Sequence, residues 1–297
     1  MVILDFAKKL NVNLLFVSAA MAAHAYADDG AGNNAISDTS VYTVFNPAPD
    51  NQLQDFCTDR PTKSNLPCTV DAGHFQYEAD AFNWTYNHTG NLTQNTYLYT
   101  NPTFKIGITR RSDVEINIAP LVEVNAHNNL THTTTDLTGM GDLYLRYKYN
   151  LIGYNGGDMS LTLLPYVKAP SADPGIGNKQ VEGGLIVPVS FALPQKFTLL
   201  FDPEIDAFKN TADDGYHNNY QLLANISHSL FVESVTGYAE LWSEVSDDPS
   251  GASTQASFDL SLSWLMRPNL QLDVGTNIGL NSKTPELQSY AGISQRF

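Results

Sequence analysis

The histidine, serine and acidic residues that could do acid–base or nucleophilic chemistry are scattered along this sequence. His74 and Glu78 share one parity of an alternating segment, and His228 lies at the end of another. Hydrolysis by a serine nucleophile needs a base and an acid beside it, and no Gly-x-Ser-x-Gly turn presents such a serine. Histidines in loops are more often polar surface groups than metal ligands. The sequence therefore predicts no catalytic residues, no cofactor and no metal site.

A larger set of charged residues occupies the polar positions of alternating segments, where side chains share one face of a strand. The set contains twelve carboxylates and five basic groups. Lys105, Asp142 and Arg296 belong to it, and the residues predicted to line the interior of the fold are Glu78, Asp80, Glu115, Glu123, Arg146, Lys148, Lys168, Glu182, Asp202, Glu204, Asp206, Glu240, Asp259 and Asp273. An interior this acidic would favour cations or neutral polar solutes and reject anions.

The composition of the chain agrees with this distribution. Only 16% of the 297 residues are charged, and 16 Lys+Arg against 31 Asp+Glu give a net charge of −15. Nucleic acids and anionic membrane surfaces need a positive face, so neither is expected as a partner. The remaining polarity comes from Asn, Thr, Ser, Gln and Gly, which is typical of a β-rich chain.

The elements that position these charges are strands of alternating polarity. From residue 73 to the end, segments of about ten residues with period two are separated by turn-forming residues. We predict twelve of them, at 74–86, 96–109, 114–124, 142–150, 159–169, 181–193, 197–208, 219–229, 233–243, 255–265, 270–280 and 287–297. Pro120, Pro165, Pro188 and Pro203 fall inside these segments, where they indicate bulges or misplaced boundaries.

Alternation also fits a soluble sandwich, but three features favour a transmembrane barrel. Charges are excluded from the apolar parity, as a cost of roughly 2–4 kcal/mol per lipid-facing charge requires. Short connections alternate with long polar ones such as 125–141 and 170–180. Aromatic residues gather beside the short connections, as at a membrane interface: Tyr147, Tyr149, Phe191, Phe197, Trp264 and Phe297. The predicted fold is an all-β, antiparallel, up-and-down transmembrane barrel of about twelve strands in the outer-membrane lipid.

The segment before the barrel divides into two parts. Lys8 and Lys9, an apolar stretch and the Ala25–Ala27 site predict a signal peptide over 1–27, cleaved on export. Residues 28–72 lack strand periodicity and are predicted to be an extension, either a plug with Arg60 reaching acidic lumen residues or a loose tail. Export to an oxidising compartment favours a disulfide between Cys57 and Cys68 over a catalytic thiol. The barrel itself is predicted over 73–297.

Several short segments of the chain are similar to those of a known family: Cys57-Thr-Asp-Arg-Pro61, Gly73-His-Phe-Gln-Tyr-Glu78, Gly139-Met-Gly-Asp-Leu143, Leu164-Pro-Tyr-Val-Lys-Ala-Pro170, Glu182-Gly-Gly-Leu-Ile-Val-Pro-Val-Ser190, the stretch Pro268–Asn281, and Gly292-Ile-Ser-Gln-Arg-Phe297. By these segments the chain resembles the outer-membrane transporter family named for the meta-pathway of phenol degradation. The resemblance implies a Gram-negative outer-membrane barrel and a transporter, but it supplies no site residues. The terminal Phe297 also resembles the signature that the barrel-assembly machinery recognises as a partner.

These features together predict a channel for uptake of a small molecule. Its aromatic or hydrophobic class rests on the resemblance alone, and the solute is unknown. The alternatives are a non-conducting structural or adhesive barrel and a soluble secreted sandwich. An interior of twelve strands is wider than that of eight-stranded barrels, which side chains fill, and narrower than that of open porins.

Overall fold

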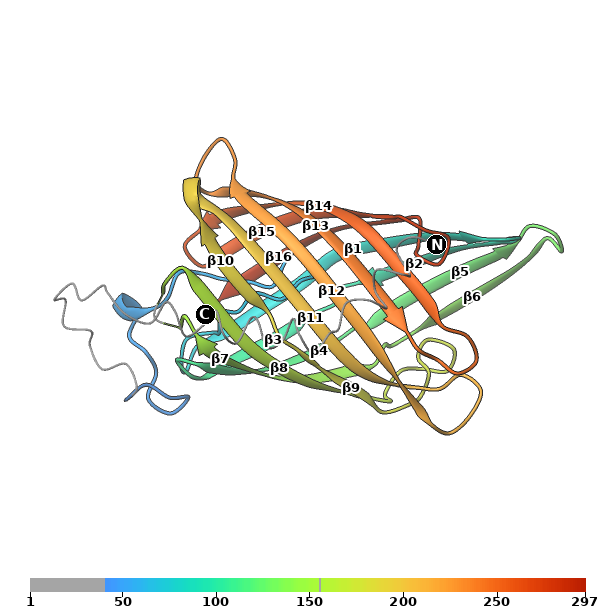
Figure 1. Ribbon diagram of the computed structural model, residues 1–297, viewed down its shortest axis with the longest axis horizontal. Helices are drawn as coiled ribbons and strands as arrows, with labels where there is room; N and C mark the ends of the chain where they lie inside the picture. The colour runs from blue at the N-terminus through green and yellow to red at the C-terminus, as the bar shows by residue number, and fades with distance from the viewer. Residues whose placement is uncertain (1–40, 155) are drawn as a thin grey trace, which may run out of the picture. The chain divides into compact units, whose positions relative to one another are not determined.

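A computed structural model describes residues 41–154 and 156–297, which belong to one compact unit. The predicted signal peptide, 1–27, and residues 28–40 lie outside the described residues. The strands form one antiparallel sheet, and pairing of the first strand with the last closes it into a barrel (Figure 1). Within the described residues, no helix is long and apolar enough to cross a membrane.

The barrel wall contains sixteen strand segments. They are β1 (Phe75–Thr89), β2 (Leu92–Tyr99), β3 (Thr103–Thr109), β4 (Ser112–Ile118), β5 (Leu121–Asn128), β6 (Thr133–Gly139), β7 (Leu143–Ile152), β8 (Met159–Ala169), β9 (Glu182–Ile186), β10 (Val189–Leu193), β11 (Phe197–Lys209), β12 (Tyr216–Ser229), β13 (Val235–Ser246), β14 (Ser253–Arg267), β15 (Leu270–Gly279) and β16 (Leu287–Arg296). Four successive pairs, β2/β3, β4/β5, β6/β7 and β9/β10, are each one interrupted strand. The twelve predicted strands are therefore confirmed.

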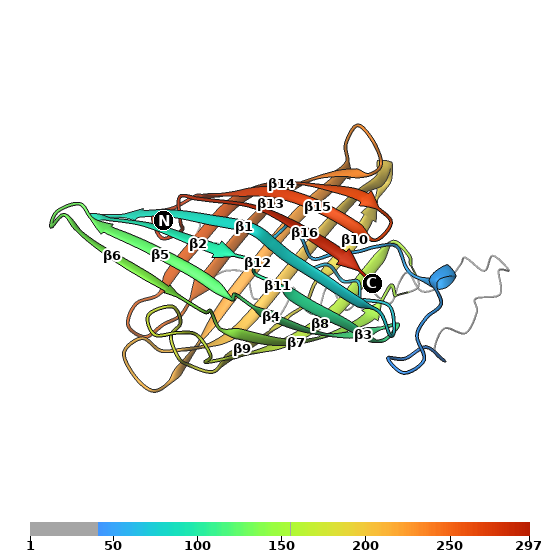
Figure 2. The ribbon, with the colours of Figure 1, turned by 180° about the vertical axis from the view of Figure 1, so that it is seen from behind.

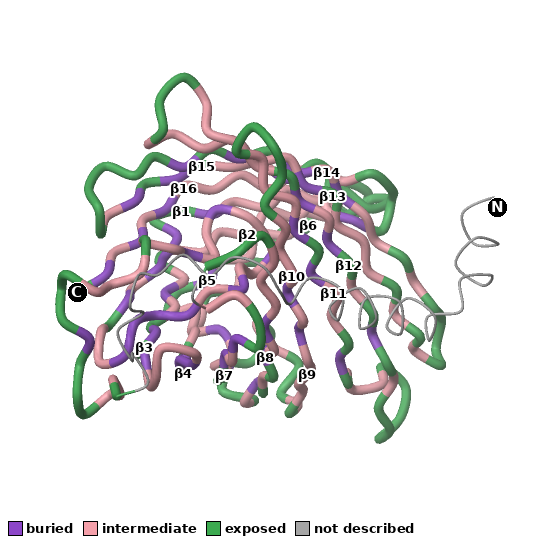
Figure 3. The backbone as a smooth tube through the Cα atoms, turned by 60° about the vertical axis from the view of Figure 1, so that its left-hand side comes forward, coloured by how far each residue is buried: buried purple, intermediate pink, exposed green. Residues whose placement is uncertain are grey.

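The distribution of polar and apolar residues in the wall is the reverse of that in a soluble protein. Among the described residues, thirty-one buried residues are polar or charged and only ten are apolar. Large apolar side chains such as Leu222, Leu241 and Val274 are at least half exposed on the opposite parity, and the exposure alternates along the strands (Figure 3). A sandwich core would bury the apolar face. The observed pattern is that of a barrel with lipid outside and a polar lumen inside.

At one level of the barrel, four neighbouring strands each change the parity of the residues that face inward, and we call this level the crease. Below it, Glu78, Thr103, Asn117 and Tyr144 are aligned by cross-strand pairing. Above it, the aligned row is Asn83, Leu98, Val122 and Gly139. The two rows are five residues apart in every strand, so each strand carries one extra residue there. An extra residue reverses the parity while keeping the same face inward, and the β1–β16 pairing shifts register at this level, between Asp80 and Phe82.

The four mid-strand prolines occupy interruptions or irregular pairings. Pro120 lies between β4 and β5, and Pro188 lies between β9 and β10. Pro165 sits where the β7–β8 pairing skips from Arg146–Tyr166 to Tyr149–Leu163. Pro203 in β11 faces the β9–β10 interruption, where its carbonyl oxygen accepts the Val187 N–H. Each missing N–H therefore falls where the ladder is already broken.

One predicted loop is a sheet extension instead. Residues 125–141 were expected to be a long connection, but they form the end of β5 and all of β6, joined by the turn 129–132. With the ends of β1 and β2 they project beyond the remaining strands (Figure 2). The other predicted connections remain, including the loop 170–181, whose residue Ile176 reaches the lumen.

Candidate functional site

The N-terminal segment (residues 41–73) attaches to the barrel at the end with the short turns. The Val44 N–H donates to the Ile108 carbonyl at 2.8 Å, and the Gly73 N–H donates to the Gly107 carbonyl at 2.9 Å. Cys57 and Cys68 form a disulfide with a Cα–Cα distance of 6.4 Å, as predicted. We call residues 57–68 the disulfide loop. Its contacts with side chains of the wall place it inside the lumen.

Arg60 joins the disulfide loop to two strands on either side of β16. Its Nη1 lies 2.6 Å from Asp80 Oδ1 in β1 and its Nη2 lies 2.7 Å from Asp273 Oδ1 in β15, while its Nε donates to Asp273 Oδ2 at 3.1 Å. Gly292 of β16 is paired with both aspartates. A Cβ at Gly292 would lie 2.1 Å from Arg60 Nη2, so glycine provides the space for the guanidinium.

Asp59 binds the opposite side of the wall. Lys105 Nζ donates to Asp59 Oδ2 at 2.5 Å and Lys148 Nζ donates to it at 2.7 Å. Burial alone would raise the pKa of Asp59, but attraction to Lys105 and Lys148 outweighs it and holds the pKa well below its usual range. The Asp59 N–H also donates to Glu78 Oε2 at 3.1 Å.

The backbone of the loop supplies further donors to wall carboxylates. The Asn65 N–H donates to Asp202 at 2.7 Å, and the N–H groups of Lys63 and Ser64 donate to Glu240 at 3.1 and 3.3 Å. The Lys63 Nζ lies 3.3 Å from Asp259. A buried carboxylate needs such donors to offset the loss of hydration. Many of the acidic residues predicted for the interior thus bind the disulfide loop.

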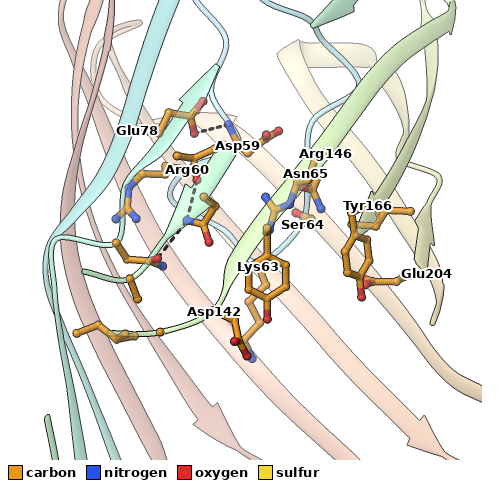
Figure 4. Close-up of a pocket in the computed structure, with 18 of the residues that line it drawn as sticks. Asp59, Arg60, Lys63, Ser64, Asn65, Glu78, Asp142, Arg146, Tyr166 and Glu204 are labelled. Carbon is orange, nitrogen blue, oxygen red and sulfur yellow. Dashed lines mark hydrogen bonds between the residues drawn. The ribbon is translucent and has the colours of Figure 1, made fainter. Parts of the chain in front are cut away.

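A cavity of about 700 Å³ remains in the lumen beside the disulfide loop. Its lining includes six residues of the disulfide loop, Arg60 and Lys63 among them, together with side chains from the wall. Figure 4 shows Arg60, Lys63, Ser64 and Asn65 with Arg146, Tyr166 and Glu204 around it. The charged lining residues are Asp59, Glu78, Asp142, Glu204, Arg60, Lys63, Lys105 and Arg146. Four acids and four bases face this space, so the expected excess of negative charge is absent from the cavity lining of the described structure.

Most of the predicted lumen residues are buried or nearly buried. Asp142 and Glu182 bind Lys168 at 3.3 and 2.6 Å, and Asp206 accepts the Tyr166 hydroxyl at 2.7 Å. The buried ones are Glu78, Asp80, Glu115, Lys148, Lys168, Asp202, Asp206, Glu240, Asp259 and Asp273. Arg146 and Glu204 line the cavity.

Glu123 is a correction, because it faces away from the lumen. Its neighbour Val122 lines the cavity and is buried, and successive side chains of a strand point to opposite faces. Glu123 is paired with Tyr97 and accepts the Tyr99 hydroxyl at 3.3 Å. The prediction carried the parity of Glu115 across the crease, where the extra residue reverses it.

Sequence reasoning did not single out Asp113, Tyr144 or Tyr166. Asp113 accepts the Val70 N–H at 2.9 Å, and the two tyrosines line the cavity. Each of these residues has the same parity as the charged residues that were selected in its strand, so parity could have identified it. Phe297 closes the wall by exchanging backbone hydrogen bonds with Phe75 at 2.8 and 3.3 Å.

Comparisons with known proteins agree with the architecture. The COG4313 outer membrane channel from Pseudomonas putida F1 has 14% identity and a TM-score of 0.58, with 81% of this chain and 100% of that chain covered. The NanC porin has 8% identity and a TM-score of 0.47, covering 74% and 98%. The β domain of the Bordetella autotransporter BrkA has 11% identity and a TM-score of 0.48, covering 75% and 99%. The first likeness supports the fold, and the other two are too distant to carry an argument.

The sequence itself identifies a family. No curated protein matches it significantly. A family model described as "Putative MetA-pathway of phenol degradation" matches residues 58–297. This match covers the disulfide loop from Thr58 onward and the whole barrel wall. Because it extends over most of the chain, the protein belongs to this family.

Proposed function

We propose that this protein is an outer-membrane channel for the uptake of small molecules, and that the disulfide loop is a plug that closes it at rest. The single observation that carries the proposal is the 700 Å³ polar cavity, lined by the disulfide loop and by the barrel wall. A solute of one ring fits such a volume, since ligand pockets commonly measure about 300–1,000 Å³. The family's association with phenol breakdown supports an aromatic class of solute.

The remaining parts of the proposal concern export and assembly. Residues 1–27 would direct export and be removed, and Phe297 would be recognised by the barrel-assembly machinery. The apolar outer face would then contact outer-membrane lipid. The carboxylates of the lumen hold the plug, and the basic residues Lys105 and Lys148 neutralise Asp59 within it.

Flux into proteoliposomes tests the transport function. Liposomes containing the full-length mature chain should admit benzyl alcohol and small neutral solutes faster than protein-free liposomes, and reduction of the Cys57–Cys68 disulfide should increase the rate. A folded barrel, recognised by heat-dependent migration on a gel, must be present in each preparation. Absence of flux before and after reduction would favour the non-conducting structural barrel.

A further inference from the structure

Of the four basic residues that line the cavity in the described part of the chain, Arg146 has the most distant ionic partner. Arg146 Nη1 lies 3.8 Å from Glu115 Oε2, which is its shortest ion pair among the described residues. The other basic residues of the lining have shorter contacts: Arg60 at 2.6 Å, Lys63 at 2.6 Å to the Ser257 hydroxyl, and Lys105 at 2.5 Å. Arg146 Nε is buried without a hydrogen-bond partner in the described structure.

Glu115 does not depend on Arg146 for its neutralisation. Lys148 Nζ lies 3.2 Å from Glu115 Oε1 and Lys105 Nζ lies 3.6 Å from it. Both lysines are therefore nearer to this carboxylate than the guanidinium is. A guanidinium has five N–H donors in a planar fork that matches a carboxylate. Arg146 lines the cavity, and 24% of its side chain is exposed.

Aromatic rings adjoin this guanidinium. Arg146 is the direct cross-strand partner of Tyr166, and its guanidinium carbon lies 5.8 Å from the centre of the Tyr144 ring. The two tyrosine rings are 6.1 Å apart and tilted by 39°. They form a wall against which one planar ring can pack, because aromatic pairs prefer offset or edge-on contact at such distances.

From this geometry we propose that Arg146 forms a binding site for the carboxylate of a small aromatic acid, with its ring against Tyr144 and Tyr166. The site lies in the cavity of the proposed channel, so the inference rests on that function and specifies a class of solute for it. It also reverses the expectation that the lumen rejects anions. The bidentate contact would give the site preference for an aromatic carboxylate over the corresponding alcohol.

The test compares benzoate with benzyl alcohol, which share a ring and differ in charge. Calorimetry on the detergent-solubilised full chain should detect benzoate binding, and Arg146→Gln should weaken it by about tenfold or more, as expected for a lost charge-assisted contact. Arg146→Lys should restore part of the affinity. Arg111→Gln changes a turn residue outside the cavity lining, so it should leave benzoate affinity unchanged.

The outcomes separate this inference from the channel function. Benzoate binding that is absent in the wild type, or equal in wild type and Arg146→Gln, overturns the inference whatever the flux. Benzyl alcohol flux into liposomes should be the same in both proteins, and its complete absence would instead contradict the channel. Heat-dependent gel migration identifies variants that have not folded. If Arg146→Gln does not fold, benzoate binding is compared between the wild type and Arg146→Lys.

Discussion

Arg60 illustrates what single residues contribute and how far sequence can predict them. Its approach to acidic lumen residues was one of two predicted arrangements for the N-terminal extension. The actual partners, Asp80 and Asp273, lie on strands that are brought together only because β16 closes the barrel between them. Periodicity assigns a side chain to a face but does not specify which distant strands become neighbours. Glu123 shows the related limit, since one extra residue at the crease reverses the face.

Replacing Arg60 should release the disulfide loop from the wall. Arg60→Ala leaves Asp80 and Asp273 buried without their shared cation, and breaking a buried ion pair in this way costs roughly 3–5 kcal/mol. Hydrogen exchange measured by mass spectrometry should show faster exchange at the amides of residues 57–68.

The amides of β12 provide the internal control, because the described ion pairs of Arg60 go to β1 and β15 and not to this strand, so β12 should exchange at the wild-type rate. Gly292→Ala is a second variant that keeps the charges and removes the space for the guanidinium. Unchanged protection of the loop in both variants would mean that Arg60 does not hold it.

At the scale of elements, alternation predicted the strands well, and composition misled the prediction at one connection. Residues 125–141 are rich in Asn and Thr, which suggested a loop. Alternation is uninformative where both faces of a sheet meet water, so the polar extension made by β5 and β6 carried no distinct signal. Pro120 and Pro188 signalled the positions of two interruptions, between β4 and β5 and between β9 and β10.

The disulfide determines how compact the loop remains. A crosslink over such a short loop stabilises by roughly 2–4 kcal/mol. Cys57→Ser/Cys68→Ser should therefore leave the barrel folded while the loop leaves the lumen more often. Cleavage by trypsin after Lys63, whose side chain lies near Asp259 in the wild type, should be faster in the double variant.

Gel electrophoresis of timed digests measures this rate, and intact heat-dependent migration confirms that the barrel is unaffected. Equal cleavage of wild type and double variant would show that the disulfide does not restrain the loop.

For the whole molecule, the low content of charged residues and the excess of acidic ones follow from a fold that is apolar outside and polar inside. Apolar residues cover the outside, and carboxylates inside bind the disulfide loop and the lysines of the wall. The barrel and its strand number were predictable because lipid imposes alternation on every strand. The fit between lumen and loop was not, since it depends on contacts between residues far apart in the chain, such as Asn65 and Asp202.

Adjacent residues of β12 test the inside–outside assignment. Leu222 is 50% exposed on the outer face, and Leu222→Arg should block assembly because a lipid-facing charge near the midplane costs roughly 2–4 kcal/mol. Gln221 lines the cavity, and Gln221→Arg should assemble, since Asp206 lies within hydrogen-bond distance of its amide at 3.2 Å. The measurement is the amount of heat-modifiable barrel in the outer-membrane fraction, and equal amounts would contradict the assignment.

The central claim is that the barrel conducts and that the disulfide loop closes it, and single-channel recording in planar bilayers tests it most directly. The wild type should be closed for most of the recording with brief openings. Arg60→Ala should show longer openings when it is recorded at the same voltage polarity and salt concentration. Arg111→Ala, at a turn between β3 and β4, should behave like the wild type. An identical, unbroken open state in wild type and Arg60→Ala, or no conductance in either, would contradict the claim.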